Sequence, residues 1–249
     1  MAASKWAPPV STNPLPLIAP DGTVSEPISG RFSVICRPEE GGEGIQRAIA
    51  NCEVGGSILL KAGVYSLRET LYLSRRVHLF GRGVAELHGE ISRASRGLWD
   101  TIISTSSATL DRVRITDAPL VDSIASSDTI WVTSGHLRLQ GCDLGTCDDK
   151  DAALRVSGPS TVADVLRCTL RGSTTFETGA TGRVEECDVR GVEGGIGIAV
   201  YNAGTAPLVA RCTIRDFEVG VSINNGAPRP RPGPLALNVF VNCGVNVVN

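Results

Sequence analysis

A cysteine recurs in the second half of the chain in a constant setting, and this repeat constrains the fold more than any other feature of the sequence. The stretches LQGCDLGT, VLRCTLRG, VEECDVRG and VARCTIRD each carry an apolar residue three positions before the cysteine and another two positions after it. Extending the pattern to weaker copies gives one column, with successive members 19 to 36 positions apart: Val77, Val113, Cys142, Cys168, Cys187, Cys212 and Cys243.

Two further apolar columns accompany the first. Two positions after it stand Leu79, Ile115, Leu144, Leu170, Val189, Ile214 and Val245, and three positions before it stand Leu110, Leu139, Val165, Val184, Val209 and Phe240. Residues two apart in a strand point to the same face, so the cysteine and the residue at +2 share a face. The residue at −3 has the opposite parity and joins that face only if the chain bends before the cysteine.

Short strands separated by a bend and repeated every 20–30 residues or so are typical of a solenoid in which each coil hydrogen-bonds to the next. A second apolar segment per coil, as in DAALRVSG, GIGIAVYNAG and VGVSINNGA, fits this arrangement. We therefore predict an all-β fold, one right-handed parallel β-helix of about seven coils. A cysteine is small and apolar enough for an inward ladder of like residues, and no histidine has a matching column, so we interpret the cysteines as packing residues.

Residues 45–67 predict how the solenoid begins. Ile45, Ala48, Ile49 and Cys52 have the i, i+3, i+4, i+7 spacing of a short amphipathic helix, and Gly55-Gly56 ends it. The stretch SILLKAGVYSL then predicts the first strand, with a turn at Lys61–Gly63. A helix at this place would cap the exposed apolar end of the solenoid.

The chain divides into a Pro-rich arm, residues 1–30, and a β-helix domain, residues 31–249, with a Pro-rich loop at 226–234. The arm lacks a continuous apolar run, so we expect an extended segment and no signal peptide. No stretch approaches the roughly 18 apolar residues of a membrane span. We expect an intracellular protein, in the cytoplasm or an organelle, with its eight cysteines reduced. Their spacings include no Cys-x-x-Cys pair, so we expect no metal and no cofactor.

Two sets of residues carry a family resemblance. The segment IQRAIANCEVGGSILLKAGVYSLRETLYLSRRVHLFGRG resembles the start of pectin-lyase-like right-handed β-helices, in particular the domain type shared by carbohydrate-binding proteins and sugar hydrolases. The Val-x-x-Cys-x-Ile-Arg-Gly coils resemble those of F-box proteins and Shc SH2-binding spindle-associated proteins, whose β-helices act as interaction modules. The resemblance covers residues 31–249 and implies the fold, but the scaffold supports many activities, so it implies no single function.

The catalytic elements of related enzymes are absent from the sequence. Polygalacturonase-like members use paired aspartates with Gly-His-Gly and Arg-x-Lys, and pectate-lyase-like members show Trp-Ile-Asp-His; neither set occurs here. We therefore assign no catalytic residue. If the protein is an enzyme, the first suspects are Asp148, Asp149 and Asp151 of CDDKD, which could ligate calcium or form a glycosidase pair. The alternative is a solvated turn between coils.

Arginines concentrate at outward positions beside the cysteine column. Arg171, Arg190 and Arg215 fall on consecutive coils, so like charges would stack at one strand spacing. We predict a basic face for an acidic partner, such as an acidic peptide, a phosphate-bearing protein or an anionic glycan, formed by Arg112, Arg114, Arg167, Arg171, Arg190, Arg211 and Arg215. The alternative is a solvated face balanced by Glu185, Asp164 and Asp216.

These observations leave two classes of function open. The net charge of −2 and the lack of aromatic interleaving argue against nucleic acid. We favour a non-catalytic interaction or structural module, a subunit of a larger intracellular assembly that binds protein partners. The alternative is a carbohydrate-active enzyme of the polysaccharide lyase or glycoside hydrolase kind, or a glycan-binding protein.

Overall fold

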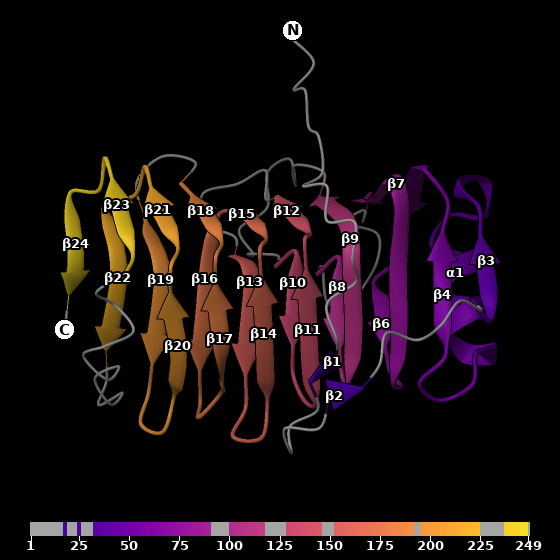
Figure 1. Cartoon of the computed structure of the whole chain (residues 1–249), viewed down its shortest axis with the longest axis horizontal. Coiled ribbons are helices and arrows are strands. Elements are labelled where there is room, and N and C mark those ends of the chain that lie inside the picture. Colours follow the sequence, from indigo (N-terminus) through magenta and orange to yellow (C-terminus); the bar gives the residue numbers. More distant parts are fainter. Residues whose placement is uncertain are drawn as a thin grey trace, which may run out of the picture.

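The computed structural model describes residues 17–18, 24–25, 32–90, 100–117, 128–145, 152–191, 195–224 and 237–248. Figure 1 shows coils stacked along the long axis, with the helix α1 (Gly41–Asn51) at one end and β24 (Val245–Val248) at the other. The predicted arm lies outside these ranges except for β1 (Leu17–Ile18) and β2 (Val24–Ser25), which pair antiparallel. The predicted Pro-rich loop at 226–234 lies wholly outside them.

One side of every coil belongs to an eight-stranded parallel sheet. Its strands are, in order, β6 (Leu71–Leu73), β8 (Ile102–Ser104), β10 (Ile130–Val132), β13 (Ala152–Ser157), β16 (Ser173–Glu177), β19 (Ile196–Tyr201), β22 (Val219–Asn224) and β24. Inward residues of these strands, such as Ile102, Ile130 and Leu154, are register partners and are fully buried. They form one wall of the core.

A 14-stranded sheet supplies the other two sides, because it bends at its longest strands, β7 (Val77–Gly89) and β9 (Ala108–Asp117). Their first halves join branch A, which also contains β3 (Val34–Cys36), β4 (Ser57–Leu60), β11 (His136–Gln140), β14 (Val162–Leu166), β17 (Thr181–Glu185) and β20 (Ala206–Ala210). Their second halves join branch B, which also contains β5 (Gly63–Leu67), β12 (Asp143–Gly145), β15 (Thr169–Arg171), β18 (Asp188–Arg190), β21 (Thr213–Arg215) and β23 (Val239–Val241).

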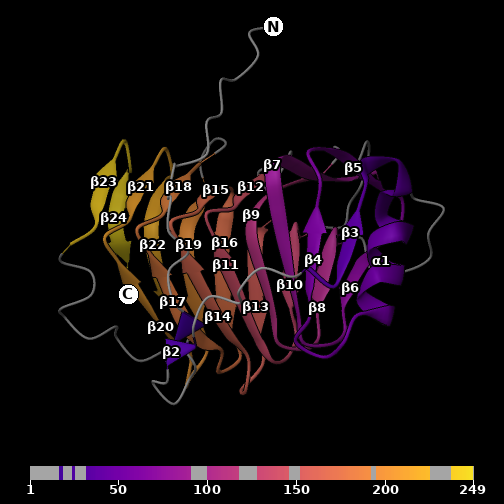
Figure 2. The same ribbon diagram turned by 45° about the vertical axis from the view of Figure 1, so that its right-hand side comes forward.

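Three parallel sheet sides wound in about seven turns confirm the predicted fold, a right-handed parallel β-helix. Figure 2 shows the strands of branch A side by side along the solenoid and α1 closing its end. The helix confirms the predicted cap: Ile45, Ala48 and Ile49 are buried, and Gln46 binds the backbone of Tyr72 through both amide atoms, at 2.9 and 3.2 Å. The predicted turn at Lys61–Gly63 separates β4 from β5. Strand β3 precedes the helix, so the first coil starts earlier than predicted.

The bend between branches A and B depends on one left-handed residue per coil. It stands directly before the inward residue at the corner, with φ between 54° and 59°, at Arg112, Gly141, Arg167, Glu186 and Arg211. A non-glycine residue in this region costs roughly 1–2 kcal/mol. The left-handed residue changes the direction of the chain, and this is how the residues at −3 and at the cysteine both reach the core.

Each corner cysteine occupies a small space and also satisfies backbone groups. The Sγ atoms of Cys142, Cys187 and Cys212 lie 3.3–3.5 Å from carbonyl oxygens of the preceding coil, at Leu110, Val165 and Val184. The cysteines of this ladder, including Cys168, are at most 3% exposed. Thiols can donate weakly to carbonyls that the bend removes from the strand ladders. The ladder is therefore structural, as predicted.

Two members of the predicted column are wrong. At its start, Val77 pairs with Ala108, and the true partner of Val113 is Ala85, because residues 81–84 interrupt the register of β7 against β9. Leu79 therefore lies with Leu110 on branch A.

At the other end, the residue of the last coil that aligns with Cys212 is Asn238. Cys243 lies after β23, at the next corner of that coil. The Cys212 amide donates to Asn238 Oδ1 at 2.8 Å, and Val239 pairs with Thr213. Phe240 accordingly pairs with Ile214, on branch B. The sequence pattern around Cys243 resembles that of the column because Asn242, directly before it, also has a left-handed backbone conformation, with φ of 51°. Asn242 lies at a different corner of the coil.

Thiol labelling tests the ladder. We expect Cys142, Cys168, Cys187 and Cys212 of the folded protein to resist a water-soluble thiol reagent, because all four are buried in the core. The half-buried Cys243 serves as the internal reactive control. Mass spectrometry of peptides labelled before and after denaturation gives the result. Rapid labelling of the four ladder thiols in the folded state would contradict it.

Candidate functional site

The outer surface of branch B carries an arginine row. Arg171 on β15 is the register partner of Arg190 on β18, which is the partner of Arg215 on β21. Parallel strands lie about 4.8 Å apart, so three guanidinium groups project from consecutive coils at that spacing. The structure thus brings together these three predicted residues.

A second outward column runs beside the arginine row and contains the neutralising acids. It consists of the register partners Glu86, Arg114, Asp143, Thr169, Asp188 and Thr213. Asp143 Oδ2 accepts a 2.8 Å hydrogen bond from Arg171 and lies 3.8 Å from Arg114 Nε. Asp188 accepts from Arg190 Nε at 2.7 Å and from Arg215 Nε at 3.0 Å. These two aspartates therefore offset the repulsion between the stacked arginines.

The site extends along the strands toward the start of the solenoid. Glu86 Oε2 lies 3.5 Å from Arg114 Nη1, and Glu86 Oε1 accepts a 2.9 Å hydrogen bond from the Thr116 hydroxyl. The same hydroxyl lies 2.9 Å from His88 Nδ1. Acidic and basic side chains thus alternate over six consecutive strands of branch B, from β7 to β21.

Asp143 has an unusual environment for an outward residue. Its side chain is only 2% exposed, and its Oδ1 atom has no hydrogen-bond partner in the part of the chain that the structure describes. Arg114 Nε, on the neighbouring strand, is also buried and makes no hydrogen bond among the described residues, although it lies 3.8 Å from Asp143 Oδ2. Burial raises the pKa of Asp143 in spite of the nearby Arg171 and Arg114. A buried acceptor and a buried donor therefore both lack a hydrogen bond at this point.

Asp188 has the opposite electrostatic environment. Burial opposes its ionisation, but hydrogen bonds from Arg215 and Arg190 outweigh that effect and lower its pKa. Asp143 and Asp188 are two strands apart in one column, so their Cα atoms are separated by roughly 10 Å. Two carboxylates whose pKa values are moved in opposite directions are a common arrangement for acid and base roles.

The other three predicted arginines lie at the corner between the branches, away from the arginine row. Arg112, Arg167 and Arg211 are the left-handed residues of the bend. They form ion pairs with Asp111, with Glu186, and with Glu185 and Glu186, respectively. All seven predicted arginines have an acidic neighbour within 4.0 Å.

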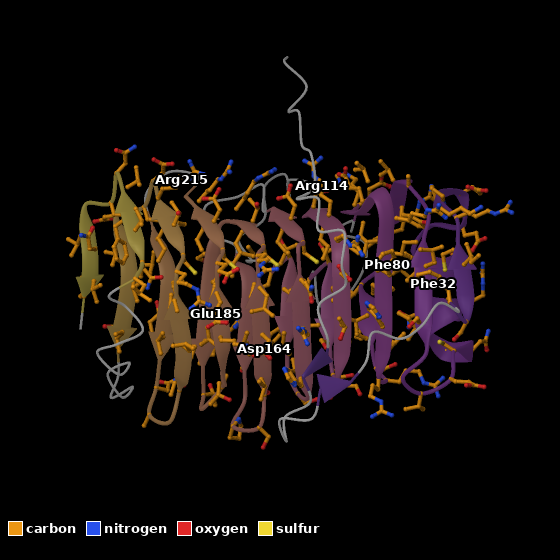
Figure 3. The ribbon with its side chains drawn as sticks, in the orientation of Figure 1. Phe32, Phe80, Arg114, Asp164, Glu185 and Arg215 are labelled. Atoms are coloured by element: carbon orange, nitrogen blue, oxygen red, sulfur yellow. The ribbon has the colours of Figure 1, made fainter. Side chains whose placement is uncertain are left out.

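The expected balancing acids lie elsewhere. Asp164 and Glu185 stand on the outer surface of branch A, where Arg183 pairs with both, at 3.3 and 3.6 Å. Figure 3 shows them on the broad face of the solenoid, while Arg114 and Arg215 lie along its edge. Asp216 accepts from the Asn242 side chain at 3.1 Å. The positive charge of the arginine row is instead balanced by Asp143 and Asp188.

Asp148, Asp149 and Asp151, the suspected catalytic acids, lie outside the described residues. Within the described ranges, no group of three or more histidines, cysteines or acids could hold a metal ion, and no helix is long and apolar enough to cross a membrane.

A second group of acids that sequence reasoning missed has a structural role. Asp100 Oδ1 accepts the backbone N–H of Asp128 at 2.8 Å, and Asp128 Oδ1 accepts that of Ala152 at 3.3 Å. Each aspartate therefore joins its own coil to the next. The repeated Asp-Thr-Ile of WDTII and SDTIW could have revealed this pair.

Comparison with known proteins supports the fold alone. No protein-family model matches the chain, and no curated protein matches it. Among solved structures, a pectin methylesterase from Aspergillus niger is similar with a TM-score of 0.55 and 14% identity, over 86% of each chain. A pectin methylesterase in complex with a hexasaccharide is similar with a TM-score of 0.51 and 15% identity, over 89% of this chain and 82% of that one. Because fewer than one residue in six is identical, what the chain shares with these proteins is the parallel β-helix.

Proposed function

We propose that the protein is carbohydrate-active and binds an acidic polysaccharide along the outer surface of branch B. The observation that carries the proposal is the pair Asp143 and Asp188, with pKa values moved in opposite directions, beside the arginine row. Guanidinium groups bind carboxylates in planar, two-pronged geometry, so regularly spaced arginines suit a polymer with regularly spaced carboxylates. The structurally similar pectin methylesterases, by name, act on pectin, an acidic polysaccharide.

Each residue then has a role in the proposed site. Arg190 and Arg215 contact uronate carboxylates, and Arg171 orients Asp143 through its 2.8 Å hydrogen bond. Asp143, whose pKa is raised by burial, is the proton donor through Oδ1, and Arg114 Nε donates a hydrogen bond to a substrate oxygen. Asp188, ionised beside two arginines, supplies the negative charge. The proposed reaction class is hydrolysis of an acidic glycan or of its ester.

Glycan binding is the direct test. We expect a galacturonate oligosaccharide to raise the melting temperature, since a ligand at 100 times its Kd stabilises a protein by about 2.7 kcal/mol. The double variant Arg190→Gln, Arg215→Gln should weaken binding at least tenfold, through loss of two charge-assisted contacts. Arg47→Gln is the matched control, because Arg47 lies on α1 and pairs only with the exposed Glu43 among the described residues. A neutral oligosaccharide should have no effect.

Equal binding by the double variant and the Arg47 control would overturn the proposal. No shift with any acidic or neutral glycan would favour the second candidate function, an intracellular protein-interaction module. That candidate is supported by the last described coil, where Leu237, Val239, Val241 and Val245 are exposed on or beside strands that end the two sheets. Exposed apolar residues on sheet edges are common at protein contacts.

A further inference from the structure

Arg138 breaks the pattern of charge pairing on the solenoid surface. Every other arginine on strands β9 to β21 has a carboxylate within 4.0 Å: Arg112, Arg114, Arg155, Arg171, Arg183, Arg190 and Arg215. Arg138, on β11 in branch A, has none among the residues that the structure describes. It is half-buried, so solvent does not fully replace the missing partner.

The carboxylates nearest to Arg138 are already engaged. Arg138 pairs in register with Asp164, whose Oδ atoms lie 3.1 Å from His136 and 3.3 Å from Arg183. Asp111, diagonally across on β9, accepts from Arg112 Nε at 3.1 Å. Asp164 and Asp111 still attract Arg138 electrostatically, but neither forms an ion pair with it within 4.0 Å among the described residues.

Two further donors lie in the same outward column as Arg138. His78 on β7, Thr109 on β9 and Arg138 on β11 are successive register partners. His78 Nε2 and Arg138 Nε are buried and make no hydrogen bond within the described ranges, and Thr109, between them, is half-buried. The three Cα atoms span roughly 10 Å, a distance over which long side chains can converge on one small ligand.

Aromatic residues flank this column on one side. His78 lies edge-on to Phe80, with ring centroids 6.2 Å apart, and Phe80 lies 5.4 Å from Phe32. Figure 3 shows the two phenylalanines next to each other on the broad face of the solenoid. The Arg112 guanidinium lies 4.3 Å from the Phe80 ring centroid, so this flank is aromatic with a cation over it.

We propose that His78, Thr109 and Arg138 form a second binding site, for a phosphate group. Three donors, one of them cationic, match a tetrahedral oxyanion, which offers more acceptor oxygens than a carboxylate. Burial lowers the pKa of His78, so the ring is neutral and donates from Nε2 in the tautomer that carries the proton there. The site lies on branch A and does not depend on the function proposed for branch B.

Calorimetric titration of the full chain with inorganic phosphate tests the proposal. We expect saturable binding that Arg138→Met weakens about tenfold or more, the value of one charge-assisted contact. Arg68→Met, at an exposed arginine after β5, should bind as the original protein does. Thr109→Val should weaken binding several-fold, and it keeps the test decisive if Arg138→Met fails to fold. The His78 Nε2 resonance should shift on phosphate addition.

Two further comparisons distinguish a phosphate ester from free phosphate, and a phosphate from a carboxylate. Glucose 6-phosphate binding more tightly than inorganic phosphate, with glucose inert, would identify a phosphate ester as the natural form, and the reverse order would identify the free ion. Acetate should not compete at matched ionic strength. Acetate binding as tightly as phosphate, absence of saturation up to about 20 mM phosphate, or binding by Arg138→Met within twofold of the original protein would each overturn the proposal.

Discussion

Gly182→Ala is expected to destabilise the solenoid strongly, because the added methyl group would collide with the backbone of the neighbouring coil. A Cβ at position 182 of β17 would lie 2.0 Å from the carbonyl oxygen of Ala163 and 2.7 and 2.8 Å from two further backbone atoms of that residue. Because the obstacle is the backbone of the neighbouring strand β14, no side-chain rotation relieves it. The glycine also has φ of 135°, which alanine avoids.

The expected loss in the free energy of unfolding is about 4 kcal/mol or more, the range seen when a core substitution forces backbone to move. For a domain of this size that corresponds to a fall in melting temperature of roughly 10 °C or more. Thermal unfolding followed by circular dichroism gives the measurement. If the variant does not accumulate in folded form, that outcome agrees with the expectation.

Gly195→Ala separates the steric effect from the conformational one. Gly195 also has a positive φ, of 73°, but a Cβ there meets nothing within 4 Å. The control should therefore lose only about 1 kcal/mol, the cost of a left-handed alanine. Equal losses in the two variants would show that contact between coils at Gly182 does not limit stability.

The sequence predicted the inner ladders well because a stacked coil repeats its residue types in register. Cys168, Cys187 and Cys212 share a column in the sequence and a ladder in the structure. The prediction failed at Val77 because Val77 and Leu79 have the same i, i+2 apolar spacing as Ala85 and Leu87. Residue type alone does not reveal that four inserted residues separate those two segments of β7.

The site was predicted in part for a related reason. The stacking of Arg171, Arg190 and Arg215 follows from the repeat, because register is periodic. The burial of Asp143 does not, since it depends on how the branches and their neighbours close around one position. A usable indication was present: Asp143 stands between the inward Cys142 and Leu144 and is the register partner of Arg114. The acids at 148–151, by contrast, are distinguished in the sequence only by their density of charge.

The second large effect concerns Asp143. If Asp143 transfers a proton to substrate, Asp143→Asn should lower turnover of an acidic polysaccharide at least about 100-fold, the contribution typical of a general acid. The same change should not lower stability at pH 7, because the amide removes a carboxylate that burial disfavours more than Arg171 and Arg114 favour it. Replacement of a poorly compensated buried charge is often neutral or stabilising.

The pH dependence has a definite sign. The pKa of Asp143 is raised in the folded protein, so the group favours folding below its unfolded value near 3.8 and loses that contribution as pH rises through the folded value. Any stability advantage of Asp143→Asn should therefore be largest at neutral pH and shrink as the medium is acidified. Chemical denaturation at several pH values measures it.

Asp188→Asn is the matched contrast, two strands along the same column. Its pKa is lowered by Arg215 and Arg190, so its contribution is present above the unfolded value near 3.8 and is lost as pH falls. The variant should lose about 1–2 kcal/mol at pH 7, through two weakened hydrogen bonds to a charged group. A large loss of stability in Asp143→Asn would show instead that Asp143 is chiefly a structural counter-ion for the arginine row. Unchanged stability together with abolished turnover would mean that the chain keeps a buried acid for its chemistry, because that acid adds nothing to the fold.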